Sequence, residues 1–385
     1  MTATVAYRHD LAGALVSGSV VRSQWLRRAF EDTPREVFVP RFYRRSESGH
    51  KVLVEGTDPA QHEQWLRGVY SDEALTVQVT PAPDLVDPAG APTSSSSMPT
   101  VMAGMLEALD LQPGHRVLEI GTGTGYNAAL LCQRVGAHHV ASVELDPALA
   151  DAARRALAEL GLHPRVHTGD GAAGLAAAAP FDRIIATAST DHIPPAWISQ
   201  LAPGGAIVVD VRGSLAGSLL RLTRTERDLV EGAFLNLPGA FMPMRTRLDS
   251  PHRDGESWEQ VLDQRNPHQA TTPVNPALVA QNRSLQFMTQ LHLAGRRLRG
   301  FVLDGTEISG HGTDGSWFTA GLGPDNDGLY PVAQGGPQRL WDTVESSYFC
   351  WRRLGEPGVE QFGVTALDDA ELQYVWCDHP DSQHR

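Results

Sequence analysis

A glycine-rich segment, RVLEIGTGTGYNAALL, holds the residues of this chain best suited to binding chemistry and spans residues 116–131. Its apolar run ending at Glu119 is typical of a buried strand, and the Ala- and Leu-rich run after the glycines predicts a helix. Glycines at such a turn let a ligand approach the backbone where the helix begins. We expect the turn to be contributed by Gly121, Thr122, Gly123 and Gly125.

The glycine spacing indicates which ligand the turn would take. A dinucleotide-binding loop would place its third glycine at position 126, which is Tyr126. The observed G-x-G-x-G, with Glu119 two residues ahead of it, favours S-adenosylmethionine instead, whose ammonium group Glu119 could meet directly or through water. A nucleotide site and a purely structural turn are the alternatives.

Two further acidic residues follow predicted strands. Glu144 ends the next strand in SVELDP, where its carboxylate can accept bonds from both ribose hydroxyls, and Leu145 is assigned to the same subsite. Asp170 follows the third strand in TGDGAAG, where it can accept from the adenine amino group while Gly171 leaves room for the ring. The alternative is that both acids are ordinary caps at strand ends.

The elements that must position these residues read as strands alternating with helices. Apolar strands are predicted at 117–120, 140–145, 166–168, 184–188 and 206–211, with antiparallel closing strands at 219–222 and 233–235. Asp146-Pro147 supplies a cap and a first-turn proline for the helix between two of them. The pattern predicts an α/β, Rossmann-like, doubly wound sheet.

The rest of the chain divides by composition. We expect an N-terminal cap, helical over residues 11–45, and a substrate-side loop at 81–97, together forming residues 1–100. The core would span 101–248 and a polar linker would span 249–275. A C-terminal module, with substrate recognition as its expected role, would span 276–385. The module's late tryptophans are expected in its core: Trp341, Trp351 and Trp376.

Composition excludes several classes of protein. The 385 residues include 32 basic and 45 acidic side chains, and the net charge of −13 disfavours nucleic-acid binding. No apolar run reaches membrane-spanning length and the N-terminus lacks a signal-peptide pattern, so we expect a cytoplasmic protein with no membrane partner. Three scattered cysteines and the absence of an HExxH pattern argue against a disulfide framework and a catalytic metal.

Seven segments in order resemble the protein-L-isoaspartate O-methyltransferase family over residues 15–245. They are TPREVFVP (33–40), VYSDEALT (69–76), the stretch from SSMPTVMAGM through GTGTGYNAAL (96–130), TGDG (168–171), APFDRIIATAS (179–189), IPPAWISQLAPGGAIVV (193–209) and FMPMR (241–245). The resemblance implies a class I methyltransferase fold that binds S-adenosylmethionine and releases S-adenosylhomocysteine. It also implies methyl transfer to a peptide carboxylate, giving an ester that collapses to a succinimide.

The resemblance also suggests substrate-side residues. Alignment through Pro99 places the family's catalytic serine on Ser97, with Ser95 and Ser96 as additional hydrogen-bond donors. Arg245, carried in FMPMR, would steer the carboxylate. His192 is a candidate substrate contact for a separate reason, its position after the fourth strand near the expected cofactor rim. The chain departs from the family where the turn before this serine becomes the longer PAPDLVDPAGAPT (81–93).

The serine run, TGDGAAG and the long tail resemble an actinobacterial subgroup that modifies ribosomally made peptides. That resemblance implies methylation of an ordinary aspartate in a cyclised precursor peptide, giving an aspartimide or isoaspartate. Repair of isoaspartate in damaged proteins, or a non-catalytic module that binds cofactor and peptide, are the alternatives. The oligomeric state is left open.

Overall fold

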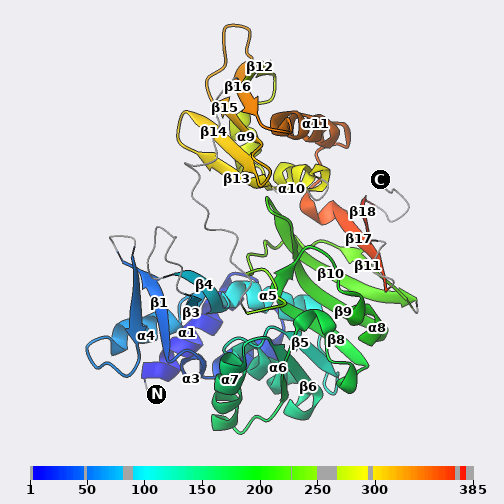
Figure 1. Cartoon of the computed structure of the whole chain (residues 1–385). Helices are drawn as coiled ribbons and strands as arrows, with labels where there is room; N and C mark the ends of the chain where they lie inside the picture. The colour runs from blue at the N-terminus through cyan, green and yellow to red at the C-terminus, as the bar shows by residue number, and fades with distance from the viewer. Residues whose placement is uncertain are drawn as a thin grey trace.

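The computed structural model describes residues 3–46, 50–80, 90–226, 228–248, 267–293, 298–368 and 373–378. Residues 81–89 of the predicted substrate-side loop and 249–266 of the predicted linker lie outside the described residues. Three sheets are built from the described parts of the chain, and Figure 1 shows a small N-terminal sheet, a large central one and a third formed by later residues.

The central sheet has the strand order β18-β17-β11-β10-β9-β8-β5-β6-β7. Its parallel half confirms the predicted α/β pattern, because β5 (Val117–Ile120) lies between β6 (Val140–Glu144) and β8 (Phe181–Thr190), flanked by β7 (Arg165–Thr168) and β9 (Leu201–Arg212). The closing strand predicted at 219–222 lies within β10 (Gly217–Glu226), which is antiparallel to β9. The one predicted at 233–235 is displaced, because β11 spans Leu229–Ala233 and pairs antiparallel with β10. The fold is a doubly wound parallel sheet extended by antiparallel strands.

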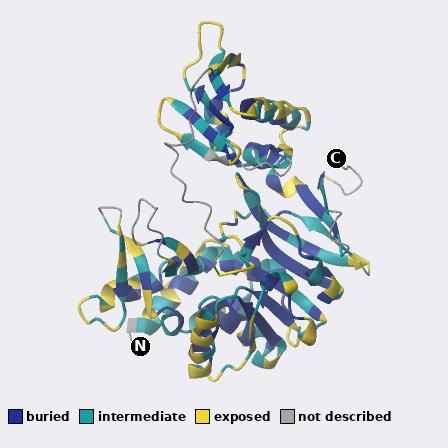
Figure 2. Cartoon of the chain, viewed as in Figure 1, coloured by how far each residue is buried: buried dark blue, intermediate teal, exposed yellow. Residues whose placement is uncertain are grey.

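Both faces of this sheet are covered, which explains its near-continuous apolar strands. Val117 packs with α5 (Pro99–Leu109) and α6 (Tyr126–Val135), whereas its neighbour Leu118 belongs to the cluster on the opposite face. Figure 2 shows the strands buried between these layers. As predicted, Asp146 caps α7 (Pro147–Glu159) by accepting from the amides of Ala148 and Leu149.

The N-terminal region corrects two expectations. After α1 (Ala3–Ser17), α2 (Gln24–Asp32) and α3 (Arg35–Phe38), residues 41–45 form strand β1 (Arg41–Arg45) rather than continuing the helical cap. The prediction of a loop at 81–97 is wrong for residues 91–96, which form strand β4 (Ala91–Ser96) and pair with β3 (Leu75–Thr80). Backbone pairing across the sheet outweighs the weak strand propensity of a Ser- and Pro-rich sequence. The remaining elements here are β2 (Lys51–Glu55) and α4 (His62–Val69), in a sheet of order β2-β1-β3-β4.

The described residues from 267 onward contribute to two sheets, a separate five-stranded sheet and the edge of the central sheet. An antiparallel sheet of order β12-β16-β15-β14-β13 packs with helices, whereas β17 (Phe362–Leu367) and β18 (Gln373–Cys377) return to the edge of the central sheet. Residues 268–272, expected in the linker, form strand β12 of the five-stranded sheet, whereas the division of the chain at 248 stays a prediction. The elements of the smaller assembly are β12 (His268–Thr272), α9 (Pro276–Gln281), α10 (Arg283–His292), β13 (Leu298–Leu303), β14 (Glu307–Gly312), β15 (Trp317–Gly321), β16 (Tyr330–Gly335) and α11 (Leu340–Arg353).

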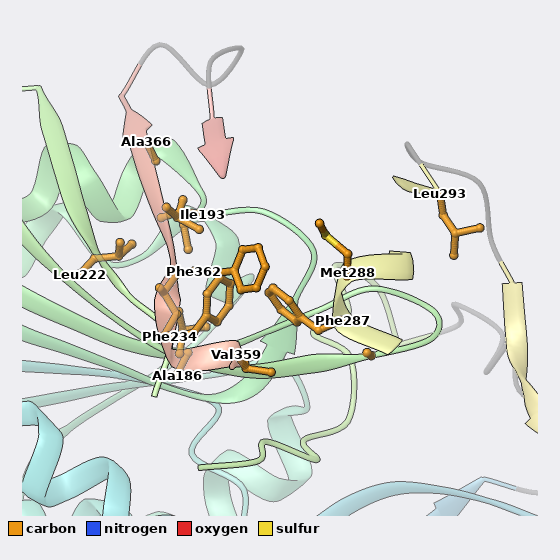
Figure 3. Close-up of a cluster of buried hydrophobic side chains, with 14 of the residues drawn as sticks. Ala186, Ile193, Leu222, Phe234, Phe287, Met288, Leu293, Val359, Phe362 and Ala366 are labelled. Carbon is orange, nitrogen blue, oxygen red and sulfur yellow. The ribbon is translucent and has the colours of Figure 1, made fainter. Parts of the chain in front are cut away.

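Helix α10 joins this assembly to the central sheet. The Phe287 ring lies 4.8 Å from that of Phe234 and 5.4 Å from that of Phe362, and Figure 3 shows the three rings together. The three late tryptophans are buried, which confirms the prediction that they belong to the core: Trp341, Trp351 and Trp376. Among the described helices, none is both long and apolar enough to cross a membrane.

Candidate active site

A cavity of about 350 Å³ opens where the parallel strands end. Ligands bind at this edge of open α/β sheets because loops there diverge to either face. Its walls come from the turn after β5, the end of β6, the start of α6, strand β4 and the segment 238–245. Six of the predicted cofactor residues line the cavity: Gly121, Thr122, Gly123, Glu144, Leu145 and Gly171.

The turn after β5 is held in a conformation that glycine favours. Gly121, Gly123 and Gly125 have φ angles of +88°, +53° and +90°, in the region that side chains disfavour. Gly125 does not line the cavity; it begins α6, and a Cβ atom there would lie 3.1 Å from the Cβ of Ala153. Its role is to let the helix start close against α7.

Glu144 faces the cavity with both carboxylate oxygens already positioned. One accepts from the amide of Gly123 at 2.7 Å and the other from the amide of Asp146 at 3.1 Å. Each carboxylate oxygen can accept more than one bond. The group therefore retains capacity for two adjacent hydroxyl groups, as the ribose assignment requires.

Glu119 lies behind the turn rather than in the cavity wall. Its side chain is 0% exposed, and it accepts from the Asn127 amide nitrogen at 2.8 Å and from the Ser142 hydroxyl. Loss of hydration on burial raises the pKa of Glu119 from 4.5 to about 7, although these two hydrogen bonds act in the opposite direction. The structure thus gives no direct path from this carboxylate to a ligand.

Asp170 also lies outside the cavity lining. Its carboxylate accepts from the amide of Ala172 at 2.9 Å, capping the short turn Gly171–Ala173. Gly171 does line the cavity, and its carbonyl oxygen accepts from the indole nitrogen of Trp197 at 2.8 Å. A Cβ atom on Gly171 would lie 2.5 Å from Ile120, so only glycine fits at this position.

The serine run forms the wall opposite the glycine turn. Ser94, Ser95, Ser96 and Ser97 all line the cavity. The two walls face each other closely, since a Cβ atom on Gly123 would lie 3.6 Å from the Ser95 carbonyl oxygen. The structure therefore brings the predicted substrate serines and the predicted cofactor turn into one cavity.

Arg35 holds the end of this serine wall, a role that the sequence analysis missed. Its guanidinium is 0% exposed and donates to the Ser97 carbonyl at 3.0 Å, the Ser96 hydroxyl at 3.3 Å and the Val69 carbonyl at 2.9 Å. Burial lowers the pKa of Arg35 to about 10, so the group stays charged at neutral pH. The TPREVFVP segment contained this residue, but nothing in its spacing indicated the contact.

A second chain of bonds connects the serine strand to the cofactor side. The Thr93 hydroxyl donates to Gln78 at 2.8 Å, and the Gln78 amide donates to the Asp146 carboxylate at 2.7 Å. Arg245 lines the cavity and donates to the Thr93 carbonyl at 3.3 Å. These contacts fix the distance between the two walls.

His192 is not brought to the cavity. It is exposed, does not line the cavity, and its ring pairs with Asp191 at 2.7 Å. The sequence predicted His192 near the rim of the cavity because it follows β8. Strand β8 extends to Thr190, however, and the segment after it, with His192, lies outside the cavity lining.

Asn127 and the apolar part of the lining were not predicted from the sequence. Asn127 follows Tyr126 on the first turn of α6 and lines the cavity, as do Met98, Met102, Phe241 and Met244. Segment 241–244 reaches this place by pairing with the end of β8: Ser189 bridges to Pro243 and its amide donates to the Met242 carbonyl at 2.9 Å. Only tertiary pairing reveals that contact.

The lining fits S-adenosylmethionine. It offers a backbone cradle at Gly121 and Gly123, a carboxylate with free capacity at Glu144, and apolar surface for a ring and a methyl group. In the part of the chain that the structure describes, no group of three or more metal-ligating side chains is found.

Comparison with known proteins gives a consistent result. A family model described as protein-L-isoaspartate(D-aspartate) O-methyltransferase matches residues 7–245, which is more than half of the chain. A protein-L-isoaspartate O-methyltransferase of Anaeromyxobacter dehalogenans is 46% identical over 150 residues, covering 38% of this chain and 71% of its own. One of Hyperthermus butylicus is 32% identical over 247 residues, covering 62% of this chain and 88% of its own.

The fold likeness extends beyond the matched residues. A solved structure described as protein-L-isoaspartate O-methyltransferase has a TM-score of 0.54 and 22% identity, and the alignment covers 97% of this chain and 100% of that one. At this identity the likeness concerns the fold alone. It does include the residues after 245, so an extension of this kind is shared with that protein.

Proposed function

Because the chain belongs to the protein-L-isoaspartate(D-aspartate) O-methyltransferase family, we propose that it methylates the free carboxylate of L-isoaspartyl residues in peptides and proteins. The chain is an S-adenosylmethionine-dependent carboxyl methyltransferase. The observation that carries the proposal is the single cavity in which the serine wall 94–97 faces the glycine turn 121–123.

The bound donor supplies a methyl group on a positively charged sulfur. A peptide carboxylate is ionised near pH 7 and needs no base to become a nucleophile. What the protein must provide is position, so that one carboxylate oxygen faces the methyl carbon in line with the bond that breaks. The new bond joins that oxygen to the methyl carbon, and the bond from this carbon to sulfur breaks with its electron pair remaining on sulfur.

We assign the positioning to Ser97, with Ser95 and Ser96 beside it. A serine hydroxyl donates one hydrogen bond and can hold the carboxylate oxygen that does not react. Arg35 fixes this segment through the Ser97 carbonyl and the Ser96 hydroxyl. Arg245 adds positive charge on the same side of the cavity, which favours an anionic substrate.

Apolar side chains on the wall of the cavity suit the transfer step. Met98, Met102, Phe241 and Met244 line the cavity beside the polar groups. Such a lining keeps water from the methyl group and strengthens the hydrogen bonds made inside. The ester product would then lose methanol when the next backbone nitrogen attacks it.

A second candidate is methylation of an ordinary aspartate in a modified, cyclised precursor peptide. It is favoured by the sequence of the substrate-side wall, where four serines follow the unusually long stretch 81–93. The extension after residue 245 does not favour it, because a solved structure described as an isoaspartate methyltransferase shares the fold over 97% of this chain.

We also propose that residues 1–100 and 276–385 contribute to substrate recognition.

Three peptides decide between the candidates when each is incubated with the protein and radiolabelled S-adenosylmethionine. They are a linear peptide with L-isoaspartate, the same peptide with aspartate, and a macrocyclic precursor with aspartate. We expect base-labile methyl ester on the isoaspartyl peptide alone. Preference for the macrocycle would favour the second candidate, and labelling of none of them by a protein that binds the donor would refute both.

A further inference from the structure

Asn127, which lines the cavity, carries a buried acceptor that none of the described residues satisfies. The residue is 6% exposed, lies on the first turn of α6 and lines the cavity. Its side-chain oxygen is buried and has no hydrogen-bond partner among the described residues. Buried polar atoms are nearly always paired, so an unpaired one beside a binding cavity indicates a ligand that donates to it.

The orientation of the Asn127 amide is fixed from behind. Its nitrogen lies 2.8 Å from a Glu119 carboxylate oxygen, which can only accept while the group is ionised. The other Glu119 oxygen accepts from Ser142, whose hydroxyl is also 2.5 Å from that of Thr122. Because the nitrogen must face Glu119, the oxygen of the same amide is directed elsewhere.

The donor that this oxygen suits is a cation. In its ionised form Glu119 places negative charge one amide group behind it, and polarisation along the hydrogen-bonded pair strengthens the acceptor. Asn127 lines the cavity and the Glu119 carboxylate does not, so Asn127 is the residue of this pair placed to touch the ligand.

We propose that the Asn127 side-chain oxygen accepts a hydrogen bond from the ammonium group of the cofactor's amino-acid moiety, and that Glu119 acts on the cofactor through Asn127. The inference rests on the proposed function, since it takes S-adenosylmethionine as the ligand of this cavity. It assigns Asn127 as a binding residue and Glu119 as a positioning residue.

Two ligands distinguish a loss of this contact with the ammonium group from a general loss of packing in the cavity. S-adenosylhomocysteine carries the amino-acid moiety, whereas 5′-methylthioadenosine lacks it and keeps the adenosine and the sulfur. Calorimetric titration of the full chain with each gives the ratio of the two affinities. In Asn127→Leu, which keeps the size but cannot accept a bond, we expect S-adenosylhomocysteine to bind at least about tenfold more weakly and 5′-methylthioadenosine to bind unchanged.

Each outcome bears on the proposal. If both ligands weaken equally in Asn127→Leu, or if neither does, the contact with the ammonium group is refuted. Should Asn127→Leu fail to fold, Asn127→Ala, which also lacks a side-chain acceptor, is titrated in the same way and judged by the same ratio. A wild-type chain that binds neither ligand would overturn the proposed function and this inference with it, whereas a wild-type chain that binds both isolates the test of Asn127.

Discussion

The ionisation of Glu119 should lower the unfolding free energy of the ligand-free protein as the pH rises. Burial raises the pKa of this carboxyl group from 4.5 to about 7 in the folded state. Between these pH values the folded protein retains a proton that the unfolded chain has released. The contribution of Glu119 to stability is therefore fully present below pH 4.5 and is lost as the pH rises to about 7.

The size of the effect follows from the two pKa values. Each pH unit between them is equivalent to about 1.4 kcal/mol, which gives about 3 kcal/mol over the whole interval. Glu119→Gln keeps an acceptor for the Asn127 amide but carries no titratable group. The variant therefore does not lose this part of its unfolding free energy as the pH rises. The unfolding free energy of the variant relative to wild type should increase by about 3 kcal/mol between pH 4.5 and pH 8.

Urea-induced unfolding followed by tryptophan fluorescence measures this difference at several pH values, without cofactor. Taking the variant minus the wild type cancels the titration of all other groups. Glu159→Gln, at an exposed position on α7, is a matched control that should show a difference of less than about 0.5 kcal/mol. A difference for Glu119→Gln that stays the same from pH 4.5 to pH 8 would refute the argument that burial keeps this group protonated.

Three further predictions concern the serine wall and the C-terminal assembly. Ser97→Ala should reduce methyl transfer at least about tenfold with unchanged S-adenosylhomocysteine binding, because one hydrogen bond to the substrate is lost; the exposed Ser199→Ala is the control, and equal activity of the two variants would contradict the role of Ser97. Arg35→Lys should lower both the melting temperature and kcat, since an ammonium group cannot reach all the acceptors that the guanidinium contacts; a variant with wild-type kcat would show that the wall needs no such support. Phe287→Ala should cost about 3–5 kcal/mol of unfolding free energy, as expected for a buried aromatic ring; an unchanged urea midpoint would mean that α10 contributes little to the packing on the central sheet.

Local signals in the sequence were sufficient where neighbouring residues determine the structure. The turn at Gly121, Gly123 and Gly125 was predicted because side chains disfavour its positive φ angles. The strands of the parallel half were predicted because both faces are buried, and Asp146 was predicted as a cap because its carboxylate reaches the amides two and three residues on.

The serine wall, in contrast, was misjudged because its partner is distant. Residues 91–96 read as loop by composition but form a strand on pairing with β3. Arg35 was missed as its support, since it reaches Ser96 and Ser97 across more than 60 residues of chain. His192 was predicted near the cavity because it follows β8. That strand extends to Thr190, so His192 lies outside the cavity lining.

The sequence by itself determined the kind of protein: a doubly wound sheet whose first glycine turn and strand-end acids suit an adenosyl cofactor. Spacing along the chain is enough for that, because turns, caps and strand periodicity are local. Only the tertiary structure decided which side chains meet the ligand. It places Glu119 and Asp170 outside the cavity wall, and Asn127 and Ser94–Ser97 in it. The physical reason is that contact with a ligand depends on depth and direction, which packing between distant segments sets.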